Sequence, residues 1–326
     1  MKLAIRTPCP RRPQLAAIWA IVSLTACGSS NTPAGAGAIV GIQRHPSPTA
    51  HLVTGAPAHI AVIVMENEEY SGIIGSPSAP YVNSLARRYA LATGMYAITH
   101  PSLPNYLALT GGSTFGIDSD CTGCAVRATS IVDQLERADL SWRAYMEDLP
   151  EGRAGTCFTS ASAGEYAKKH DPVAYYTRIT DNQRRCTNIV PLARLAADEA
   201  GGTLPRYLWI TPNLCNDMHD CPVSTGDRFL SMLVPPLLRS LGKGGLLFLT
   251  WDEGSSDSGC CRLASGGHIV TIVAGPGARA GARLATPADH YSVLQTIEDL
   301  LGLARLRGAA CACTPSLQPM LAGPRG

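Results

Sequence analysis

The sequence predicts an α/β fold: a single large domain with a mainly parallel central sheet flanked by helices. Continuous apolar runs of strand length occupy residues 59–65 and 245–251. Such runs are typical of strands buried on both faces of a parallel sheet. Helical patterns separate the predicted strands along the chain, as in α/β proteins. Hydrophobic residues make up 45% of the chain and charged residues 16%, which is enough for a sizeable core.

Strands are expected wherever a short apolar run is bounded by polar or glycine-rich residues. In chain order these are residues 59–65, 91–98, 141–146, 207–210, 245–251 and 269–274.

Helices are expected where start and stop signals frame an apolar pattern. Gly111 and Gly112 end a short helix, a Thr-Ser pair with Asp133 opens another, and Asp289 caps the last one. Pro235 is expected to bend or shift a long helix. The predicted helices are residues 79–89, 105–110, 129–138, 188–200, 227–241 and 291–301.

The first 57 residues are predicted to precede the folded domain at residues 58–326. Residues 1–26 are expected to be a lipoprotein-type signal peptide, because basic residues precede an apolar segment too short to span a bilayer. The run from Leu24 to Cys27 resembles a bacterial lipobox, in which Cys27 would carry a lipid anchor. A plain signal peptide cleaved near Ala26 is the alternative. Residues 27–57 are rich in Gly, Ala, Pro, Ser and Thr, which predicts a flexible tether.

The charge balance excludes a nucleic-acid-binding stripe. Four of the 27 basic residues precede Cys27, which leaves 23 basic against 25 acidic residues in the remainder. No basic run of the kind that binds nucleic acid is present.

Cysteine usage indicates an exported chain. Apart from Cys9 and Cys27 there are ten cysteines, an even number that suits disulfides in an oxidising compartment. A zinc site at Cys121 and Cys124 is the alternative to a disulfide there. Cys121/Cys124, Cys157/Cys186 and Cys215/Cys221 are suited to local disulfides. Cys260, Cys261, Cys311 and Cys313 could pair among themselves, and one option ties the C-terminus to the loop after Glu253; the sequence leaves the connectivity open.

Polar residues gather where two predicted strands end. Glu66 and Asn67 follow the first strand, and Asp252 and Glu253 follow a later one. In sheets of this class, ligands bind at the carboxyl ends of the strands. Hard oxygen donors suit calcium, magnesium or manganese. We therefore expect one divalent metal ion of unidentified element at this edge.

A serine at a helix start is the candidate nucleophile. Ser102 lies between Pro101 and Pro104, and Pro104 is tolerated in the first turn of a helix. Unpaired N–H groups and the helix dipole favour an anion there. A metal touching the serine oxygen would lower its pKa. The stretch by itself fits a capping serine better, and the strand-end oxygen donors favour the nucleophile.

Histidines in polar or glycine-rich settings form a second group of candidates. Asp217 stands beside His219, Gly267 precedes His268, and His170 lies in a cationic turn suited to phosphate. Taken singly, each also fits a surface or structural histidine. The group is His100, His170, His219 and His268, whereas His290 is assigned to helix capping.

Several short motifs occur together in one order along the chain. They are Met65-Glu66-Asn67, residues 99–106, Lys169-His170, residues 212–220, Trp251-Asp252-Glu253 and His290-Tyr291-Ser292. In this combination the chain resembles the bacterial phosphoesterase family of secreted acid phosphatases and phospholipases C, and most of all the short secreted acid phosphatases of actinobacteria. The resemblance covers residues 58–303.

The resemblance implies an alkaline-phosphatase-like domain with a metal-assisted nucleophile. It implies Ser102 as nucleophile and His219 or His268 as the proton donor. The implied phosphate contacts are Asn105, His100, His170 and Asp217, and the implied metal ligands are Glu66, Asn67, Asp252 and Glu253.

The implied activity is hydrolysis of phosphomonoesters through a phosphoserine intermediate. The substrate would be a phosphorylated small molecule or a phospholipid headgroup. A phospholipase C-type phosphodiesterase shares every motif, and a non-catalytic surface binding lipoprotein is a further alternative. The chain is expected to be exported, and either anchored to the membrane through Cys27 or secreted.

Overall fold

The computed structural model describes residues 56–151, 157–261 and 263–323. In these residues nine strands form one sheet, in which six of the eight pairings are parallel. The predicted α/β class with a mainly parallel sheet is confirmed. The strand order is β10 (Arg283–Leu284), β2 (Ala90–Tyr96), β9 (His268–Ala274), β8 (Leu246–Trp251), β1 (Ile60–Met65), β7 (Tyr207–Thr211), β3 (Trp142–Met146) and β6 (Ile189–Pro191), with β11 (Ala288–Asp289) also beside β2.

The centre of the sheet is formed by β1 and β8, both buried along their whole length. They run parallel in a register that pairs Met65 with Trp251. The residues after these two, Glu66 and Asp252, therefore leave the sheet side by side, and the Asp252 N–H donates to the Met65 carbonyl oxygen (2.9 Å). The register decides that the two polar strand ends meet.

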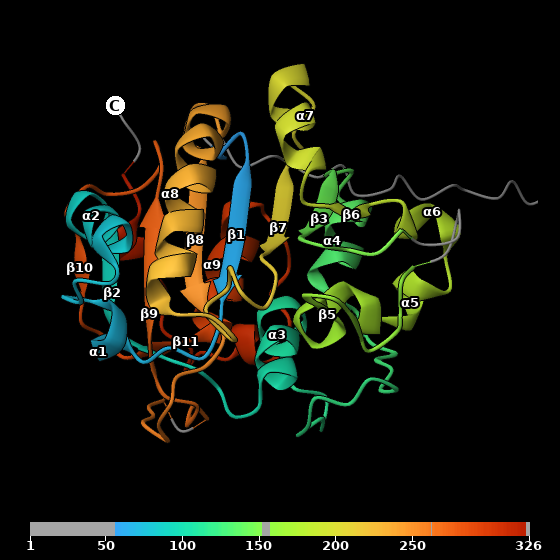
Figure 1. Ribbon diagram of the computed structural model, residues 1–326, viewed down its shortest axis with the longest axis horizontal. Coiled ribbons are helices and arrows are strands. Elements are labelled where there is room, and N and C mark those ends of the chain that lie inside the picture. Colours follow the sequence, from blue (N-terminus) through green and yellow to red (C-terminus); the bar gives the residue numbers. More distant parts are fainter. Residues whose placement is uncertain (1–55, 152–156, 262, 324–326) are drawn as a thin grey trace, which may run out of the picture. The chain divides into compact units, whose positions relative to one another are not determined.

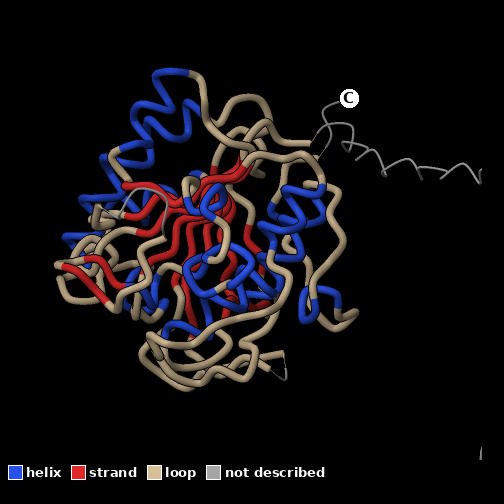
Figure 2. The backbone as a smooth tube through the Cα atoms, turned by 90° about the vertical axis from the view of Figure 1, so that its right-hand side faces the viewer, coloured by secondary structure: helices blue, strands red, loops and turns tan. Residues whose placement is uncertain are grey.

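Helices cover both faces of the sheet (Figure 2). In Figure 1, α2 (Pro80–Arg88) and α8 (Val223–Ser240) lie in front of the sheet and α9 (His290–Leu300) lies behind it. The structure confirms the helix predicted at residues 129–138 as α4 (Ile131–Arg137), where Ser130 and Asp133 form a capping box.

The helix that carries the candidate nucleophile is α3 (Ser102–Gly111), and every one of its residues is buried. It begins three residues earlier than predicted, with Ser102 as its first residue. It ends at Gly112, which has a φ of 68°. This left-handed conformation favours glycine. Figure 1 shows α3 at the lower end of β1 and β7.

One predicted helix, at residues 188–200, is wrong in its first part. Ile189–Pro191 forms the edge strand β6 beside β3, and the helix α7 covers only Arg194–Gly201. Pro191 is tolerated at a sheet edge because no ladder bond there needs its missing N–H. Short elements escaped prediction because each has too few residues for a period: α1 (Tyr70–Ile73), β4 (Ser162–Ala163), β5 (Tyr166–Ala167), α5 (Thr177–Thr180), α6 (Gln183–Cys186) and the 3-10 turns Lys168–His170, Pro172–Tyr175, Arg307–Ala310 and Gln318–Met320.

The predicted signal peptide, Cys27 and residues 27–55 of the predicted tether lie outside the described residues. Within the described part of the chain, no helix is both long enough and apolar enough to cross a membrane.

Five disulfides are present in the described residues. The three expected local pairs are confirmed, and Cys121 and Cys124 form a disulfide in place of a zinc site. The four remaining cysteines pair among themselves, as expected, but each bonds to a near neighbour, so no disulfide in the described residues ties the C-terminus to the loop after Glu253. These pairs are Cys260–Cys261 and Cys311–Cys313.

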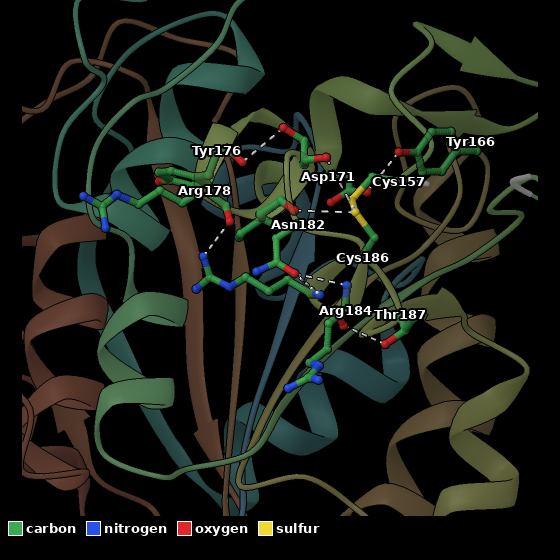
Figure 3. Close-up of a disulfide and its surroundings, with 12 residues drawn as sticks. Cys157, Tyr166, Asp171, Tyr176, Arg178, Asn182, Arg184, Cys186 and Thr187 are labelled. Atoms are coloured by element: carbon green, nitrogen blue, oxygen red, sulfur yellow. Dashed lines mark hydrogen bonds between the residues drawn. A yellow bond between two sulfur atoms is a disulfide. The ribbon is translucent and has the colours of Figure 1, made fainter. Parts of the chain in front are cut away.

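The Cys157–Cys186 disulfide spans 29 residues, the longest separation among the five. Figure 3 shows it beside Asn182, whose side chain accepts the N–H groups of Arg184 and Arg185 and caps α6. The disulfide therefore joins a loop to a helix with a defined start.

Removing this disulfide with alanine at both positions should lower the free energy of unfolding by about 3.5 kcal/mol, because the crosslink limits the unfolded chain over a long loop. The same change at Cys311 and Cys313, separated by two residues, should cost about 1 kcal/mol. Denaturant unfolding of both variants measures the difference. Equal losses would contradict the loop-length argument.

Candidate active site

The candidate nucleophile lies between the ends of β1 and β8. The Ser102 hydroxyl can donate to either of two carboxylates: its Oγ is 3.1 Å from Glu66 Oε2 and 3.3 Å from Glu253 Oε1. All three side chains are buried. The structure therefore brings together the serine and one carboxylate from each strand end.

Asp252 adds a third carboxylate that lacks a full set of partners. Its Oδ1 accepts the N–H groups of Asn67 (3.2 Å) and Glu253 (2.6 Å), whereas its buried Oδ2 has no hydrogen-bond partner in the described residues. Burial, together with the charges of Glu66 and Glu253, holds the pKa of Asp252 well above its usual range. Burial also raises the pKa of Glu253, against the opposing effect of His100. Negative charge at this point needs a cation.

The residues fit a divalent metal ion by this criterion. The donor set is rich in carboxylate oxygens, the usual ligands of hard cations, and one of these oxygens is buried without a partner. Asn67, whose main-chain N–H donates to Asp252 Oδ1, has a φ of 59°. Asparagine tolerates this left-handed conformation better than most residues. The predicted oxygen donors are Glu66, Asn67, Asp252, Glu253 and Ser102.

Glu66 is held by a second group of buried side chains. The Tyr106 hydroxyl donates to Glu66 Oε1 (2.5 Å), and His170 Nε2 lies 3.1 Å from the same oxygen. On its other side, His170 Nδ1 lies 3.2 Å from Asp217 Oδ2. Burial alone would lower the pKa of His170, but the negative charges of Glu66 and Asp217 beside its two nitrogens outweigh it and raise the pKa to about 9. His170 is therefore a buried imidazolium that lowers the pKa of Glu66 against the effect of burial.

Lys169 and His219 lie near the N-terminus of α3, together with two acidic side chains. Lys169 Nζ donates to Asp120 Oδ2 (3.1 Å) and to His219 Nε2 (3.0 Å). Asp120 Oδ1 accepts the Leu103 N–H (3.0 Å), one of the amides that the helix leaves free. His219 Nδ1 lies 2.6 Å from Asp220 Oδ1. A carboxylate thus occupies the place where a helix N-terminus and a lysine favour an anion.

A second donor set overlaps the first. Potential ligand atoms of Glu66, His170 and His219 all lie within 4.8 Å of one another. The sequence predicts a metal on oxygen donors alone, so the structure adds this alternative.

Asn105 departs from its expected role as a phosphate contact. Its Oδ1 accepts the N–H groups of Ile98 and Thr99, and its Nδ2 donates to the carbonyl oxygens of Thr99 and Pro101. The amide is thereby saturated by the main chain of the segment that leads to Ser102. Its geometry is that of a positioning residue.

His268 is also placed differently from the expectation that it donates a proton. Its ring lies between Tyr70 and Tyr96, with ring centroids 4.4 and 5.0 Å away, and its Nε2 donates to the Thr93 carbonyl oxygen (3.0 Å). None of its contacts in the described residues reaches Ser102 or the strand-end carboxylates. Of the two predicted proton donors, only His219 contacts Lys169 near the start of α3.

Asp217 and His100, two of the expected phosphate contacts, each contact another side chain of the site in this structure. Asp217 Oδ1 accepts the His219 N–H (2.8 Å), and its other carboxylate oxygen faces His170. His100 places Nδ1 2.5 Å from Glu253 Oε2 and Nε2 3.2 Å from the Ser256 carbonyl oxygen. Asp217 orients the imidazolium, and His100 holds Glu253.

Four residues of the site were missed as individual candidates. Tyr106 had a usable signal, since it lies four positions after Ser102 on the same face of α3. Lys169 was noticed within a motif but not assigned a role. Asp120 lies in a loop without a pattern. His290, assigned to helix capping, lies after the actual cap Asp289 and donates from Nε2 to the Asp252 carbonyl oxygen (2.6 Å). Burial lowers the pKa of His290 to about 4, so the ring is neutral.

The nine-stranded sheet with helices on both faces is an α/β fold that is similar to that of solved alkaline-phosphatase-like proteins. A solved protein of the alkaline phosphatase superfamily from Vibrio parahaemolyticus has this fold, with a TM-score of 0.51, 12% identity and coverage of 79% of this chain and 70% of that chain. At this identity the likeness shows the fold alone. The chain belongs to the Phosphoesterase family, which it matches over residues 76–304.

Two relatives define the reaction class. A phosphatidylinositol-3-phosphatase of Mycobacterium tuberculosis is 34% identical over 252 residues, which cover 76% of this chain and 78% of that protein. A phosphate-repressible acid phosphatase of Penicillium chrysogenum is 31% identical and is aligned over 75% of this chain and 59% of its own length. The chain is therefore a hydrolase that acts on phosphoric ester bonds, and the predicted family and enzyme class are confirmed.

Proposed function

We propose that the protein is an exported, metal-dependent acid phosphatase that hydrolyses phosphomonoesters through a phosphoserine intermediate. The observation that carries the proposal is the position of Ser102 at the start of α3, within hydrogen-bond distance of both Glu66 and Glu253. A serine in that position combines a candidate nucleophile with an anion-binding helix end and a carboxylate cluster.

One divalent ion would be held by the oxygen donors Glu66, Asn67, Asp252, Glu253 and Ser102. When bound, it would neutralise the carboxylates and lower the pKa of the serine hydroxyl. The oxygen set is favoured over the set with two histidines. Both nitrogens of His170 face carboxylates, and His219 is already engaged by Lys169 and Asp220.

The protein's own groups suit in-line displacement at phosphorus. Ser102 would give its hydroxyl proton to Glu253, one of the two carboxylates to which it can donate, and its Oγ would form a bond to phosphorus as the ester oxygen leaves. Water would then hydrolyse the phosphoserine and release phosphate. The Leu103 N–H and Lys169 are suited to bind phosphate oxygens, because both already bind one carboxylate, that of Asp120. His219 would donate the proton that the leaving oxygen needs once its ring is protonated and Lys169, which donates to His219 Nε2 here, has turned to the phosphate. Preorganised donors of this kind stabilise charge that develops in the transition state.

Two substrate classes remain within the proposal: a phosphorylated small molecule and the headgroup of a phospholipid. The first is favoured by the acid phosphatase among the relatives, and the second by the phosphatidylinositol-3-phosphatase. A phospholipase C-type diesterase is the second candidate, since it would use the same nucleophile. Hydrolysis rates on an aryl phosphate and on phosphatidylcholine separate the two activities.

Aryl phosphate hydrolysis by the purified protein should fall to background when a chelator removes divalent ions and should return when one ion is added back. The physical reason is that Asp252 and Glu253 bear charge at ordinary pH only at a cost, as their raised pKa values show. A colorimetric assay with and without chelator measures this. Full activity in chelator would refute metal dependence, and no hydrolysis with any divalent ion would refute the proposed function.

Export is supported by the five disulfides, which form and persist in oxidising compartments. We further propose that the mature protein begins at a lipid-modified Cys27 and is held at the membrane by that lipid, with secretion of the free protein as the alternative. Mass spectrometry of the mature N-terminus should show diacylglycerol on Cys27. An unmodified Cys27, or an N-terminus beyond it, would refute the anchor.

A further inference from the structure

We propose that Glu69 is a positioning residue that fixes the two metal-ligand pairs of the site relative to each other. The proposal rests on the proposed function, because it takes Glu66, Asn67, Asp252 and Glu253 as the ligands. Glu69 itself touches none of the reacting groups. It acts through the loop that follows Glu253.

The Glu69 carboxylate accepts three hydrogen bonds from that loop and its far end. Oε2 accepts the Ser255 N–H (3.0 Å), and Oε1 accepts the Ser256 hydroxyl (3.0 Å) and the His268 N–H (2.9 Å). Glu69 follows Asn67 by two positions, and Ser255 follows Glu253 by two positions. The side chain therefore links the segment behind one ligand pair to the segment behind the other.

The backbone leaves room for this carboxylate at one position in particular. A Cβ on residue 254 would lie 2.3 Å from Glu69 Oε2, so Gly254 is needed where the side chain passes. On its other side, a Cβ on Gly267 would lie 2.6 Å from the Gly254 Cα, and Gly267 has a φ of 99°. Gly254 thus leaves room for the carboxylate, and Gly267 lets the two ends of the loop approach each other closely.

The same loop reaches the segment before the nucleophile. The N–H groups of Ser265 and Gly266 donate to the carbonyl oxygens of Ile98 and Ala97. The Ser256 carbonyl oxygen accepts from His100 Nε2, and His100 also holds Glu253. Glu69 therefore holds the loop in place, and the loop in turn positions Glu253 and the segment at residues 97–100 that leads to Ser102. Groups that orient metal ligands in this way commonly change metal affinity by 10- to 100-fold when they are removed.

The matched control is the preceding residue. Glu68 has the same charge and lies on the same segment, but its side chain makes no hydrogen bond or ion pair to the described residues. Glu69→Ala and Glu68→Ala each remove one negative charge. Only Glu69→Ala also removes the three hydrogen bonds from Ser255, Ser256 and His268 to Glu69, which we call the Glu69 clamp.

Metal retention is the first readout, because it does not depend on activity. After dialysis against a graded chelator, folded Glu69→Ala should require roughly 10- to 100-fold less chelator than wild type to lose half of its divalent ion. Glu68→Ala should match wild type. Glu69→Gln keeps one acceptor oxygen but turns a donor toward the Ser255 N–H, so its retention should fall between those of wild type and Glu69→Ala.

Gly254→Ala tests the same clamp from the other side. It should reproduce the loss of metal retention, because its methyl group occupies the place of the Glu69 carboxylate. The double variant Glu69→Ala with Gly254→Ala should lose little more than either single variant, since both remove one clamp. If the fold-loss of metal retention in the double variant equalled the product of the two single-variant losses, the proposal would be contradicted.

Hydrogen exchange and kinetics complete the test. The amides of Ser255 and His268 should exchange faster in Glu69→Ala, and saturating metal should restore kcat more than it restores the amide protection. Faster exchange with metal retention equal to wild type would overturn the proposal and leave Glu69 a purely structural residue. If wild type retains metal but hydrolyses no phosphate ester, the proposed function fails while the retention measurement still decides the role of Glu69.

Discussion

Ser102→Ala should reduce the rate of aryl phosphate hydrolysis by at least about 1,000-fold, because no other hydroxyl among the described residues donates to both Glu66 and Glu253. The fold should survive. The hydroxyl makes one modest hydrogen bond, and its loss costs on the order of 1 kcal/mol. Steady-state kinetics and the thermal unfolding midpoint measure the two effects together.

Ser78→Ala is the control, since Ser78 is an exposed turn serine that makes no hydrogen bond to Glu66, Asp252 or Glu253. It should keep wild-type turnover. Phosphate trapped on wild type at low pH and located by peptide mass spectrometry should lie on Ser102. A folded Ser102→Ala protein with turnover near that of wild type would remove Ser102 as the nucleophile.

Asp252→Asn should lose both the bound ion and the activity while the protein stays folded. The Asp252 carboxylate is buried, its Oδ2 is unpartnered, and its pKa lies well above the usual range. A neutral amide removes a charge that the ion would bind. Without metal, the same change removes repulsion from Glu66 and Glu253, so the metal-free variant should unfold at a temperature equal to or above that of metal-free wild type.

The pH dependence of that stability has a defined sign. A carboxyl group whose pKa is raised on folding binds more protons in the folded state, so metal-free wild type should lose stability as pH rises above the ordinary pKa of an aspartic acid. Metal-free Asp252→Asn should lose less over the same range. Unfolding midpoints at several pH values in chelator measure the difference.

Two further variants sharpen the metal test. Asp118→Asn changes an exposed carboxylate and should retain both metal and turnover. His219→Ala separates the two donor sets: it should keep the ion but lose turnover if the oxygen donors bind the metal. If His219→Ala lost the ion and Asp252→Asn kept it, the metal ligands would be Glu66, His170 and His219 instead of the oxygen donors. Equal metal and equal turnover in Asp252→Asn and wild type would defeat the oxygen site.

The apolar runs at residues 59–65 and 245–251 were enough to predict the central strands, because a strand buried on both faces must be apolar along its whole length. The long helices were predictable from their caps and glycine ends, as at Asp289 and Gly112. Short elements such as β6 were not, because three residues cannot show a period and their hydrogen bonds come from a distant neighbour, here β3.

The residues of the candidate site likewise fall into those that local sequence patterns predict and those that they do not. Its strand-end carboxylates and Ser102 were visible in the sequence because local structure places them at strand and helix ends. The contacts of Asn105 and His268 were not predictable, because hydrogen bonds to the main chain and stacking between two tyrosines depend on packing that no motif records. Asp120 was not visible at all, since a loop brings it to the start of α3.

The sequence by itself determined the α/β class, the family, and which residue types stand at the ends of the central strands. Those features follow from local patterns of apolar, polar and turn residues. Only the tertiary structure decided that Met65 pairs with Trp251, and therefore that Glu66 and Asp252 meet beside Ser102. It also decided that His170 is charged and His290 neutral, because two carboxylates face the first ring and a carbonyl oxygen faces the second. Register and burial are set by packing between segments far apart in the chain, and the charge of a buried group follows from its neighbours.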